Sequence, residues 1–185
     1  MVMNVHSAAI VGASGYTGLE LTRLLARHPR LRLVGLYSDR WAEETAGGRL
    51  SLPEPAAALR YRPLAEGERA DAELVFLATP ADVSAELAPK LLAKGARVVD
   101  LSGAFRLADP AAYPAWYGFA HPAPALLAEA RYGLPELARE GLRGARLVTN
   151  PGCYATAVAL AVAPLVRSGL ASPEGGAVPG MSGVS

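Results

Sequence analysis

The chain has 185 residues, of which 51% are hydrophobic and 19% charged, a composition that excludes intrinsic disorder and suits about one domain of average size. Eighteen basic residues nearly balance 17 acidic ones, for a formal net charge of +1, so we expect no nucleic-acid partner. Cys153 is the single cysteine, which excludes an internal disulfide framework and a cysteine-based zinc cluster. We therefore expect no metal site.

Neither the first residues nor the most apolar stretch of the chain predicts contact with a membrane. Residues 1–6 lack the basic and long apolar regions of a signal peptide. The most apolar stretch, residues 155–166, is interrupted by Pro164 and is shorter than the ~20 residues that a membrane span needs. We expect a soluble protein of a reducing compartment, the cytoplasm.

Short apolar runs alternate with helical patterns along the chain. In chain order, we predict a strand at 7–11, a helix at 18–27, strands at 31–37 and 74–78, a helix at 83–93, strands at 97–101 and 146–149, and a helix at about 154–168. In the first helix, Leu19, Leu21, Leu24 and Leu25 fall on one face. Clusters of proline and glycine predict long surface loops at 41–55 and 108–124, and an irregular segment at 172–180. Apolar strands that alternate with helices predict an α/β fold, a Rossmann-type doubly wound and mostly parallel sheet.

A glycine-rich turn joins the first predicted strand to the first predicted helix. Gly12, Gly15 and Gly18 are spaced at intervals of three residues. A phosphate at a helix N-terminus meets unpaired N–H groups and the positive end of the helix dipole, and glycine lets the backbone approach closely. The turn predicts a dinucleotide site, although a tight turn with glycines for packing would show the same pattern.

The second predicted strand is followed by Ser38, Asp39 and Arg40, where an adenosine ribose would lie. An acid at this point favours the ribose hydroxyls of NAD, whereas an arginine can bind the 2′-phosphate of NADP. Because the guanidinium group suits phosphate, we favour NADP. The alternative is that Asp39 and Arg40 are ordinary solvated charges.

Cys153 lies where the last predicted strand passes into the last predicted helix, after Asn150-Pro151-Gly152. A thiol at a helix N-terminus is stabilised as the thiolate. Placement of the sulfur and stabilisation of an oxyanion contribute more than acidity, and candidate donors are the N–H groups after Gly152 and the Asn150 side chain. A cysteine among small apolar residues can equally be a buried hydrophobic residue.

Four segments, in this order, resemble the N-acetyl-gamma-glutamyl-phosphate reductase family, which is related to aspartate-semialdehyde dehydrogenase. They are Gly12-Ala-Ser-Gly-Tyr-Thr-Gly18, Asp100-Leu-Ser-Gly-Ala-Phe-Arg106, Tyr132-Gly-Leu-Pro-Glu136 and Asn150-Pro-Gly-Cys-Tyr154, and the resemblance continues to residues 182–185. It implies an enzyme of arginine biosynthesis that reduces a small acyl phosphate, N-acetyl-gamma-glutamyl phosphate, to the semialdehyde with NADPH.

The resemblance also implies roles for single residues. Cys153 would be the nucleophile that forms a thioacyl-enzyme with the acyl phosphate, and Arg106 would meet the substrate phosphate unless it is a salt-bridged surface residue. The pyrophosphate region of NADP would be held by Gly12, Ser14, Gly15, Tyr16, Thr17 and Gly18, and the 2′-phosphate by Ser38 and Arg40. Ser102, Asn150 and Glu136 complete the substrate side, although Glu136 could instead cap a short helix.

The chain departs from the family in its length and its histidines. The family continues past residues 182–185, and its catalytic histidine lies in that later half. Of the histidines present, His6 and His28 are not placed to serve as the base, and we expect His121 to be solvated in a proline-rich loop.

We therefore expect an NADP-binding domain at 1–150 and, at 151–185, the nucleophile helix with the start of a largely missing substrate and oligomerisation domain. The longer form would be a homo-oligomer, and the truncated chain would have little activity alone. Two alternatives stay open: a non-catalytic NADP-binding fragment, and a related reductase of lysine biosynthesis.

Overall fold

The computed structural model describes residues 4–172, 174 and 176–181, so the final part of the resemblance, 182–185, lies outside the described residues. The strands form one parallel sheet in the order β3-β2-β1-β4-β5-β7-β6. Their bounds are β1 His6–Val11, β2 Leu31–Tyr37, β3 Tyr61–Arg62, β4 Leu74–Leu77, β5 Arg97–Asp100, β6 Arg131–Tyr132 and β7 Leu147–Thr149. The five predicted strands are confirmed to within one residue at each end.

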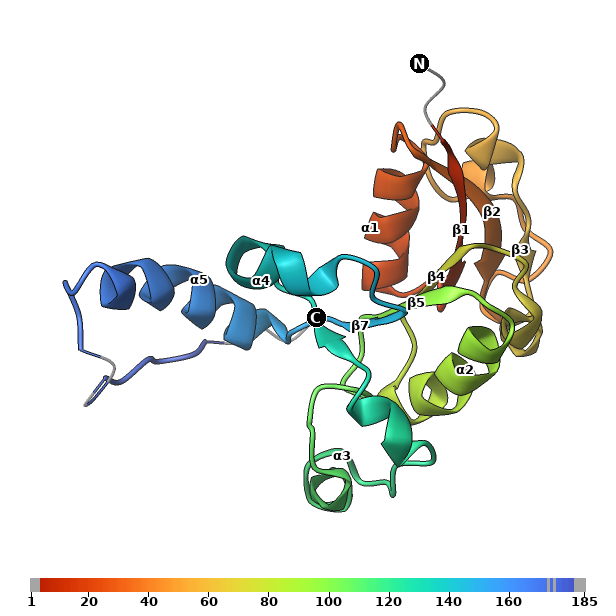
Figure 1. Ribbon diagram of the computed structural model, residues 1–185. Helices are drawn as coiled ribbons and strands as arrows, with labels where there is room; N and C mark the ends of the chain where they lie inside the picture. The colour runs from red at the N-terminus through yellow and green to blue at the C-terminus, as the bar shows by residue number, and fades with distance from the viewer. Residues whose placement is uncertain (1–3, 173, 175, 182–185) are drawn as a thin grey trace.

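Helices α1 (Tyr16–Leu25) and α2 (Ala81–Ala93) cover opposite faces of the sheet (Figure 1). In β1, Ala8 and Ile10 pack on the α1 side, whereas Ala9 and Val11 pack on the α2 side. The strand order runs outward from β1 to β2 in one direction and from β4 to β5 in the other. Right-handed crossovers then place the two helices on opposite faces, which confirms the doubly wound fold.

Helix α1 buries only part of the leucine face that the sequence predicts: Leu25 is buried and Leu21 packs against the core. Gly18, Thr22 and Leu25 are its buried residues, whereas Leu24 is 60% exposed. Gly18 lets the helix approach the turn after β1, because a Cβ atom there would overlap the Gly12 carbonyl oxygen. This close approach turns the Gly18–Thr22–Leu25 stripe, rather than Leu24, toward the sheet.

The segment at 108–124 is not the surface loop that the sequence predicts. It contains helix α3 (Tyr113–Tyr117), and it buries Tyr113 and His121 in an aromatic cluster with Phe105 and Phe119. The segment at 41–55 also sends Trp41 against buried Tyr61 of β3. Short 3-10 helices occur at Ala46–Gly48, Ala56–Ala58, Leu64–Arg69, Pro110–Ala112 and Pro124–Leu127.

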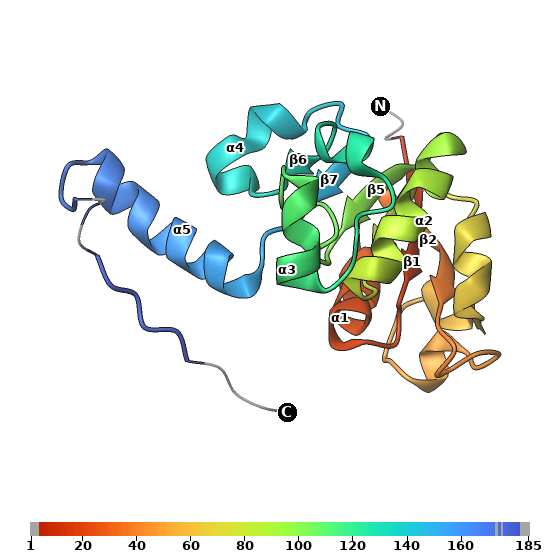
Figure 2. The same cartoon turned by 90° about the horizontal axis from the view of Figure 1, so that it is seen from below.

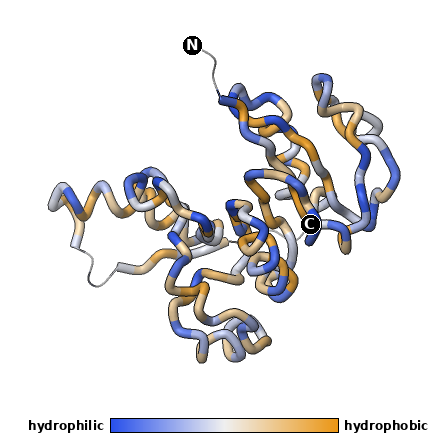
Figure 3. Tube along the Cα trace, turned by 45° about the vertical axis from the view of Figure 1, so that its right-hand side comes forward, coloured by the Kyte–Doolittle hydropathy of each residue, from blue (hydrophilic) through white to orange (hydrophobic). Residues whose placement is uncertain are grey.

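Two more helices lie beyond the sixth strand: α4 (Pro135–Leu142), which is kinked at Ala138, and α5 (Cys153–Arg167). Helix α5 extends away from the sheet in both Figure 1 and Figure 2. Figure 3 shows hydrophobic stretches along α5 as well as along the strands inside the body, yet no residue of 153–167 is buried. Among the described residues, no helix is long and apolar enough to cross a lipid bilayer.

Candidate functional site

The carboxyl ends of the parallel strands meet at one edge of the sheet, where each strand passes into a turn. Backbone hydrogen bonds join these turns from strand to strand: the Gly12 N–H donates to the Tyr37 oxygen and the Ala78 N–H to the Val11 oxygen. The Asn150 N–H donates to the Asp100 oxygen at 2.8 Å. In parallel α/β sheets this edge is where ligands bind. The turns carry the sequence-predicted residues Gly12, Ser38, Ser102 and Asn150 at this edge.

The glycine turn combines close packing with unpaired donors. Gly12 has a φ of +88°, and a Cβ atom there would overlap the Ala78 carbonyl oxygen, so the packing function of these glycines is real. Helix α1 begins with no acidic residue in its first turn and no side-chain cap. Within the described residues, the N–H groups of Ser14, Tyr16, Thr17 and Gly18 donate no hydrogen bond. Such donors are the ones that bind phosphate at a helix N-terminus.

Ser38 and Ser14 bring the ends of β2 and β1 together beside this turn. Ser38 is buried, and its hydroxyl donates to the Ser14 hydroxyl at 2.5 Å. Two cavities lie here and share Ser14, Gly15 and Arg40. One has about 250 Å³ and lies over the ends of β1, β2 and β4; the other, of about 310 Å³, is lined by Tyr16, Leu19 and Trp41 in addition to the shared residues.

Asp39 and Arg40 have different surroundings, which bears on the choice between NAD and NADP. The Asp39 carboxylate accepts the Leu64 N–H at 2.7 Å and so fixes the start of a 3-10 helix. Arg40 is exposed and lines both cavities. Within the described part of the chain it has no carboxylate partner. The polar groups at this end of the sheet therefore fit a dinucleotide that carries an additional phosphate.

Arg106 ties the turn after β5 to the turn after β7. Its Nε donates to the Asn150 carbonyl oxygen at 2.7 Å, and its Nη2 donates to the Leu101 carbonyl oxygen at 3.1 Å. The third nitrogen, Nη1, faces Gly152, whose added Cβ atom would lie 3.4 Å from it. Arg106 is thus not the salt-bridged surface residue of the alternative interpretation. Nη1 is the nitrogen left to meet an anion beside the cysteine turn.

Asp100, at the end of β5, is a buried acid that sequence reasoning missed. Its Oδ1 accepts the Ser102 N–H at 3.0 Å and the Ser102 hydroxyl at 2.6 Å. Its Oδ2 makes no hydrogen bond within the described chain. The hydroxyl of Thr149, the residue opposite Asp100 in the β5–β7 pairing, makes none either. Burial raises the pKa of Asp100, against the opposing effect of the Ser102 hydrogen bonds.

The same hydrogen bonds define what Ser102 can do. Its hydroxyl gives its proton to Asp100 and accepts the Ala104 N–H at 3.0 Å. A hydroxyl group has one proton and two lone pairs, so it keeps one lone pair and no proton for a further partner. The structure places Ser102 as the residue that shapes the turn leading to Arg106.

Cys153 is the first residue of α5 and is exposed, which contradicts its interpretation as a buried hydrophobic residue. The Thr156 N–H closes the first helical turn on the Gly152 oxygen at 2.9 Å. The Asn150 side chain lies against Gly133, whose added Cβ atom would be 2.8 Å from Oδ1. Glu136 is exposed in the first turn of α4, three residues after Gly133, and within the described residues it makes no side-chain hydrogen bond to a helix N-terminus.

The histidines lie away from the cysteine or are fully engaged. His121 is buried rather than solvated as the sequence predicts: its Nδ1 accepts the Ala123 N–H at 3.1 Å, and its Nε2 bonds the Ala104 oxygen at 2.9 Å. This pairing fixes the neutral ring with the proton on Nε2, and burial lowers the pKa of His121. His28 follows α1, and its Nδ1 accepts the Arg30 N–H.

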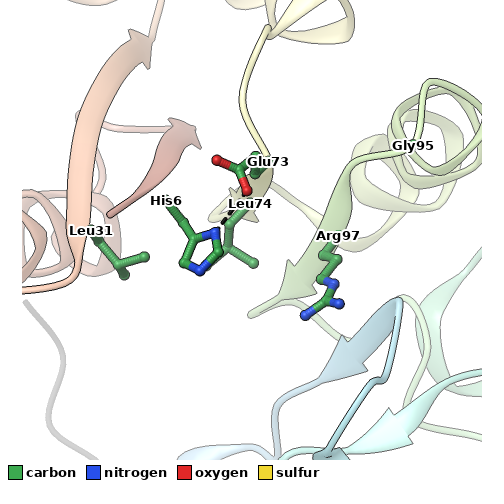
Figure 4. Close-up of a pocket in the computed structure, with 6 residues that line it drawn as sticks. All are labelled: His6, Leu31, Glu73, Leu74, Gly95 and Arg97. Carbon is green, nitrogen blue, oxygen red and sulfur yellow. Dashed lines mark hydrogen bonds and ion pairs between the residues drawn. The ribbon is translucent and has the colours of Figure 1, made fainter. Parts of the chain in front are cut away.

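A separate cavity of about 290 Å³ lies at the opposite edge of the sheet, where β1, β2, β4 and β5 begin. Figure 4 shows His6 beside Glu73, with Arg97 apart from this pair. The His6 Nδ1 lies 2.7 Å from the Glu73 Oε2. None of the sequence-predicted site residues lines this cavity, so it is distinct from the candidate site.

Comparison with known proteins gives both a family and named relatives. The family model for the semialdehyde dehydrogenase NAD-binding domain matches residues 7–145. An N-acetyl-gamma-glutamyl-phosphate reductase of Thermus thermophilus is 51% identical over 184 residues, which cover 95% of this chain and 49% of the relative. That of Halorhodospira halophila is 50% identical over 164 residues, covering 86% and 46%. The chain spans about half the length of the curated relatives it matches.

Solved structures share the fold. Aspartate semialdehyde dehydrogenase II from Vibrio cholerae, complexed with ASA, gives a TM-score of 0.64 at 19% identity over 89% of this chain and 47% of that one. A probable aspartate-semialdehyde dehydrogenase from Pseudomonas aeruginosa gives a TM-score of 0.61 at 25% identity over 89% of this chain and 43% of that one. Because the family model matches most of its length, the chain belongs to the semialdehyde dehydrogenase family, through the NAD-binding domain of that family.

Proposed function

We propose that the chain carries the nucleotide site and the nucleophile of an NADPH-dependent N-acetyl-gamma-glutamyl-phosphate reductase. The observation that carries the proposal is the position of Cys153, the exposed first residue of α5, four residues beyond β7. The glycine turn and Arg106 belong to the same edge of the sheet. Relatives with 45–51% identity bear this enzyme name, which supports the choice of substrate.

Residues 1–150 would form the cofactor domain, and 151–185 would begin the substrate domain. The unpaired N–H groups of the glycine turn would hold the pyrophosphate, and Arg40 would bind the 2′-phosphate because no carboxylate competes for it in the described chain. The cofactor, when bound, supplies the hydride that reduces an acyl group on sulfur to the aldehyde.

Cys153 would perform the covalent step. Its thiolate attacks the acyl carbon of the substrate, a new C–S bond forms, and the C–O bond to the phosphate breaks. The phosphate group leaves with the bonding electron pair, and a thioester remains on the enzyme. The first N–H groups of α5 and the Asn150 amide would stabilise the oxyanion, while Arg106 Nη1 would hold the leaving phosphate.

The lone exposed thiol also bears on location and partners. Thiols stay reduced in the cytosol, and we propose that this protein works in the cytoplasm. Its partner would be the small acyl phosphate rather than a nucleic acid or a membrane. We further propose that a full-length enzyme of this kind is a homo-oligomer.

Trapping of the thioester tests this function without requiring turnover. The acyl phosphate is made in place from N-acetylglutamate and ATP by N-acetylglutamate kinase, and the intact mass of the 185-residue chain is followed. We expect a hydroxylamine-sensitive acyl adduct that Cys153→Ser abolishes. The same substrate should protect Cys153 from iodoacetamide.

Cofactor choice is tested separately, by titration of the chain with NADPH and with NADH. Arg40→Ala should weaken NADPH binding much more than NADH binding. Equal losses would overturn the assignment of NADP. If no adduct forms while NADPH still binds, the chain is a non-catalytic NADP-binding module, and the reductase proposal fails for it.

A further inference from the structure

We infer that Trp41 is a specificity-determining residue of the nucleotide site, because its indole ring holds the Arg40 guanidinium at the wall shared by the two cavities, ready for a phosphomonoester on the ribose. The inference rests on the proposed function, since it concerns the same nucleotide. It adds a residue that the sequence motifs do not include.

The geometry places two cations against one indole ring. The Arg40 Cζ lies 5.7 Å from the ring centroid of Trp41, and the Arg49 Cζ lies 5.4 Å from it. Both distances fall within the ~6 Å over which a guanidinium group is attracted to an aromatic face. The two arginines differ in their other contacts: Arg49 makes two hydrogen bonds to the Glu44 carboxylate, whereas Arg40 contacts the indole ring and forms no ion pair within the described residues.

Trp41 is itself fixed from below. Its ring meets buried Tyr61 edge-on, with centroids 5.3 Å apart and planes at 70°. Tyr61 belongs to β3 and pairs with Leu36 of β2, so the indole ring is anchored to the sheet itself. The flexible Arg40 side chain thus packs on the indole ring of the next residue, which is held in place by Tyr61.

The contact between Arg40 and Trp41 matters for ligand binding because of where Arg40 lies. Arg40 lines both cavities, but Trp41 lines only the one of about 310 Å³. The carboxylate of the adjacent Asp39 faces the Leu64 N–H, and within the described residues it forms no ion pair with Arg40. The guanidinium hydrogens are therefore available to a dianion that enters between Ser14 and Arg40.

The expected gain is modest and measurable. An arginine loses rotamer entropy when a phosphate fixes it, and a cation–π contact at an exposed site restricts the side chain before the ligand arrives. A contact of this strength corresponds to about a two- to fivefold tighter binding of a ligand that carries the phosphomonoester. A ligand without that group should gain nothing.

Two adenosine ligands separate the effect on the phosphomonoester from that on the rest of the nucleotide. The 185-residue chain is titrated with 2′,5′-ADP, which has the ribose 2′-phosphate, and with 5′-AMP, which lacks it. Trp41→Leu should weaken 2′,5′-ADP binding about two- to fivefold and leave 5′-AMP binding unchanged, and Trp41→Phe should retain most of the affinity. Arg49→Ala is the matched control, because it removes the other cation from the same ring but lines neither cavity.

Fluorescence gives a second measurement that does not depend on a folded Trp41 variant. The chain has two tryptophans, and Trp116 is 78% exposed, so Trp116→Phe leaves Trp41 as the only tryptophan, which excitation at a wavelength that tyrosine does not absorb observes alone. We expect 2′,5′-ADP, but not 5′-AMP, to change Trp41 emission, because the phosphate binds beside the guanidinium group that stays on the indole ring. Arg40→Ala should abolish that change.

The outcomes distinguish this inference from the proposed function. If Arg40→Ala selectively loses 2′,5′-ADP while Trp41→Leu binds it normally, the inference is overturned and the NADP assignment stands. If Trp41→Leu loses both ligands equally, Trp41 supports the whole cleft, and the inference is again overturned. If Arg40→Ala loses neither ligand, the NADP assignment fails as well.

Discussion

Replacing Gly12 with alanine adds one methyl group where the turn after β1 lies against the end of β4. Two penalties act there. The φ of +88° is a backbone conformation that disfavours a side chain, and the new Cβ atom would meet the carbonyl group of Ala78. The chain offers a control that separates them: Gly95 has the same φ of +88°, but its added Cβ atom would meet nothing within 4 Å.

The magnitudes follow from these two environments. A left-handed conformation costs alanine about 1–2 kcal/mol, and alanine recovers about 0.4–1 kcal/mol because it restricts the unfolded chain. Gly95→Ala should therefore lower the free energy of unfolding by roughly 1 kcal/mol. Gly12→Ala adds about 1–3 kcal/mol of overpacking against backbone that cannot rotate away, so its total loss should be about 2–4 kcal/mol.

Urea unfolding followed by circular dichroism measures both variants, and NADPH titration measures the consequence at the site. Gly12→Ala should also weaken NADPH, because it separates the turn from β4, whereas Gly95→Ala should bind NADPH like the parent chain. Equal free-energy losses in the two variants would refute the reasoning, since they would mean that the close approach to Ala78 contributes nothing.

Three further substitutions test buried contacts. His121→Phe should lower the free energy of unfolding by about 1–3 kcal/mol at pH 7.5. The difference from the parent chain should be smaller at pH 5, because the lowered folded-state pKa of His121 makes the parent less stable as pH falls below about 6.5. A difference in urea midpoints that stays constant with pH would contradict this. Asp100 has a raised folded-state pKa, so parent stability is lost as pH rises through that pKa. The stability of Asp100→Asn relative to the parent chain should therefore increase from pH 4 to pH 8. Free energies of unfolding that change in parallel with pH in the two proteins would contradict this. Arg106→Lys keeps the charge but replaces the two fork nitrogens that bond the Asn150 and Leu101 oxygens with one ammonium nitrogen on a flexible stem. The variant should lose about 1–3 kcal/mol of unfolding free energy, and a change within the error of the unfolding curves would contradict this prediction.

Much of the sheet is predictable from the sequence because its central strands are apolar on both faces. The run at Leu31–Tyr37 is bounded in the structure as it is in the sequence. Strands β3 and β6 have two residues each, too few for any periodic pattern, and they exist through pairing with β2 and β7. Leucine spacing predicts the wrong surface for Leu24, because it does not report how closely Gly18 lets the helix approach the sheet.

At the site, motifs predict which residues lie at the sheet edge but not which atoms they use. Arg106 bonds backbone carbonyl oxygens, and no side-chain pattern in a sequence reports such partners. Asp100 escaped notice because ionisable residues are rarely fully buried; an acid that ends an apolar strand, two residues before a serine, was the available signal. The sequence predicts a solvated His121, because the aromatic neighbours that bury it come together only in the fold.

Gly103, in the turn that leads to Arg106, lies against Tyr117 of the 108–124 segment. A Cβ atom at Gly103 would overlap the ring of Tyr117 in α3, and the His121 ring bonds the backbone of the next residue, Ala104. The 108–124 segment therefore supports the turn that positions Arg106. Connecting segments usually tolerate insertions or deletions. In this segment such changes would shift the Arg106 guanidinium group and, through its bond to Asn150, the turn that carries Cys153.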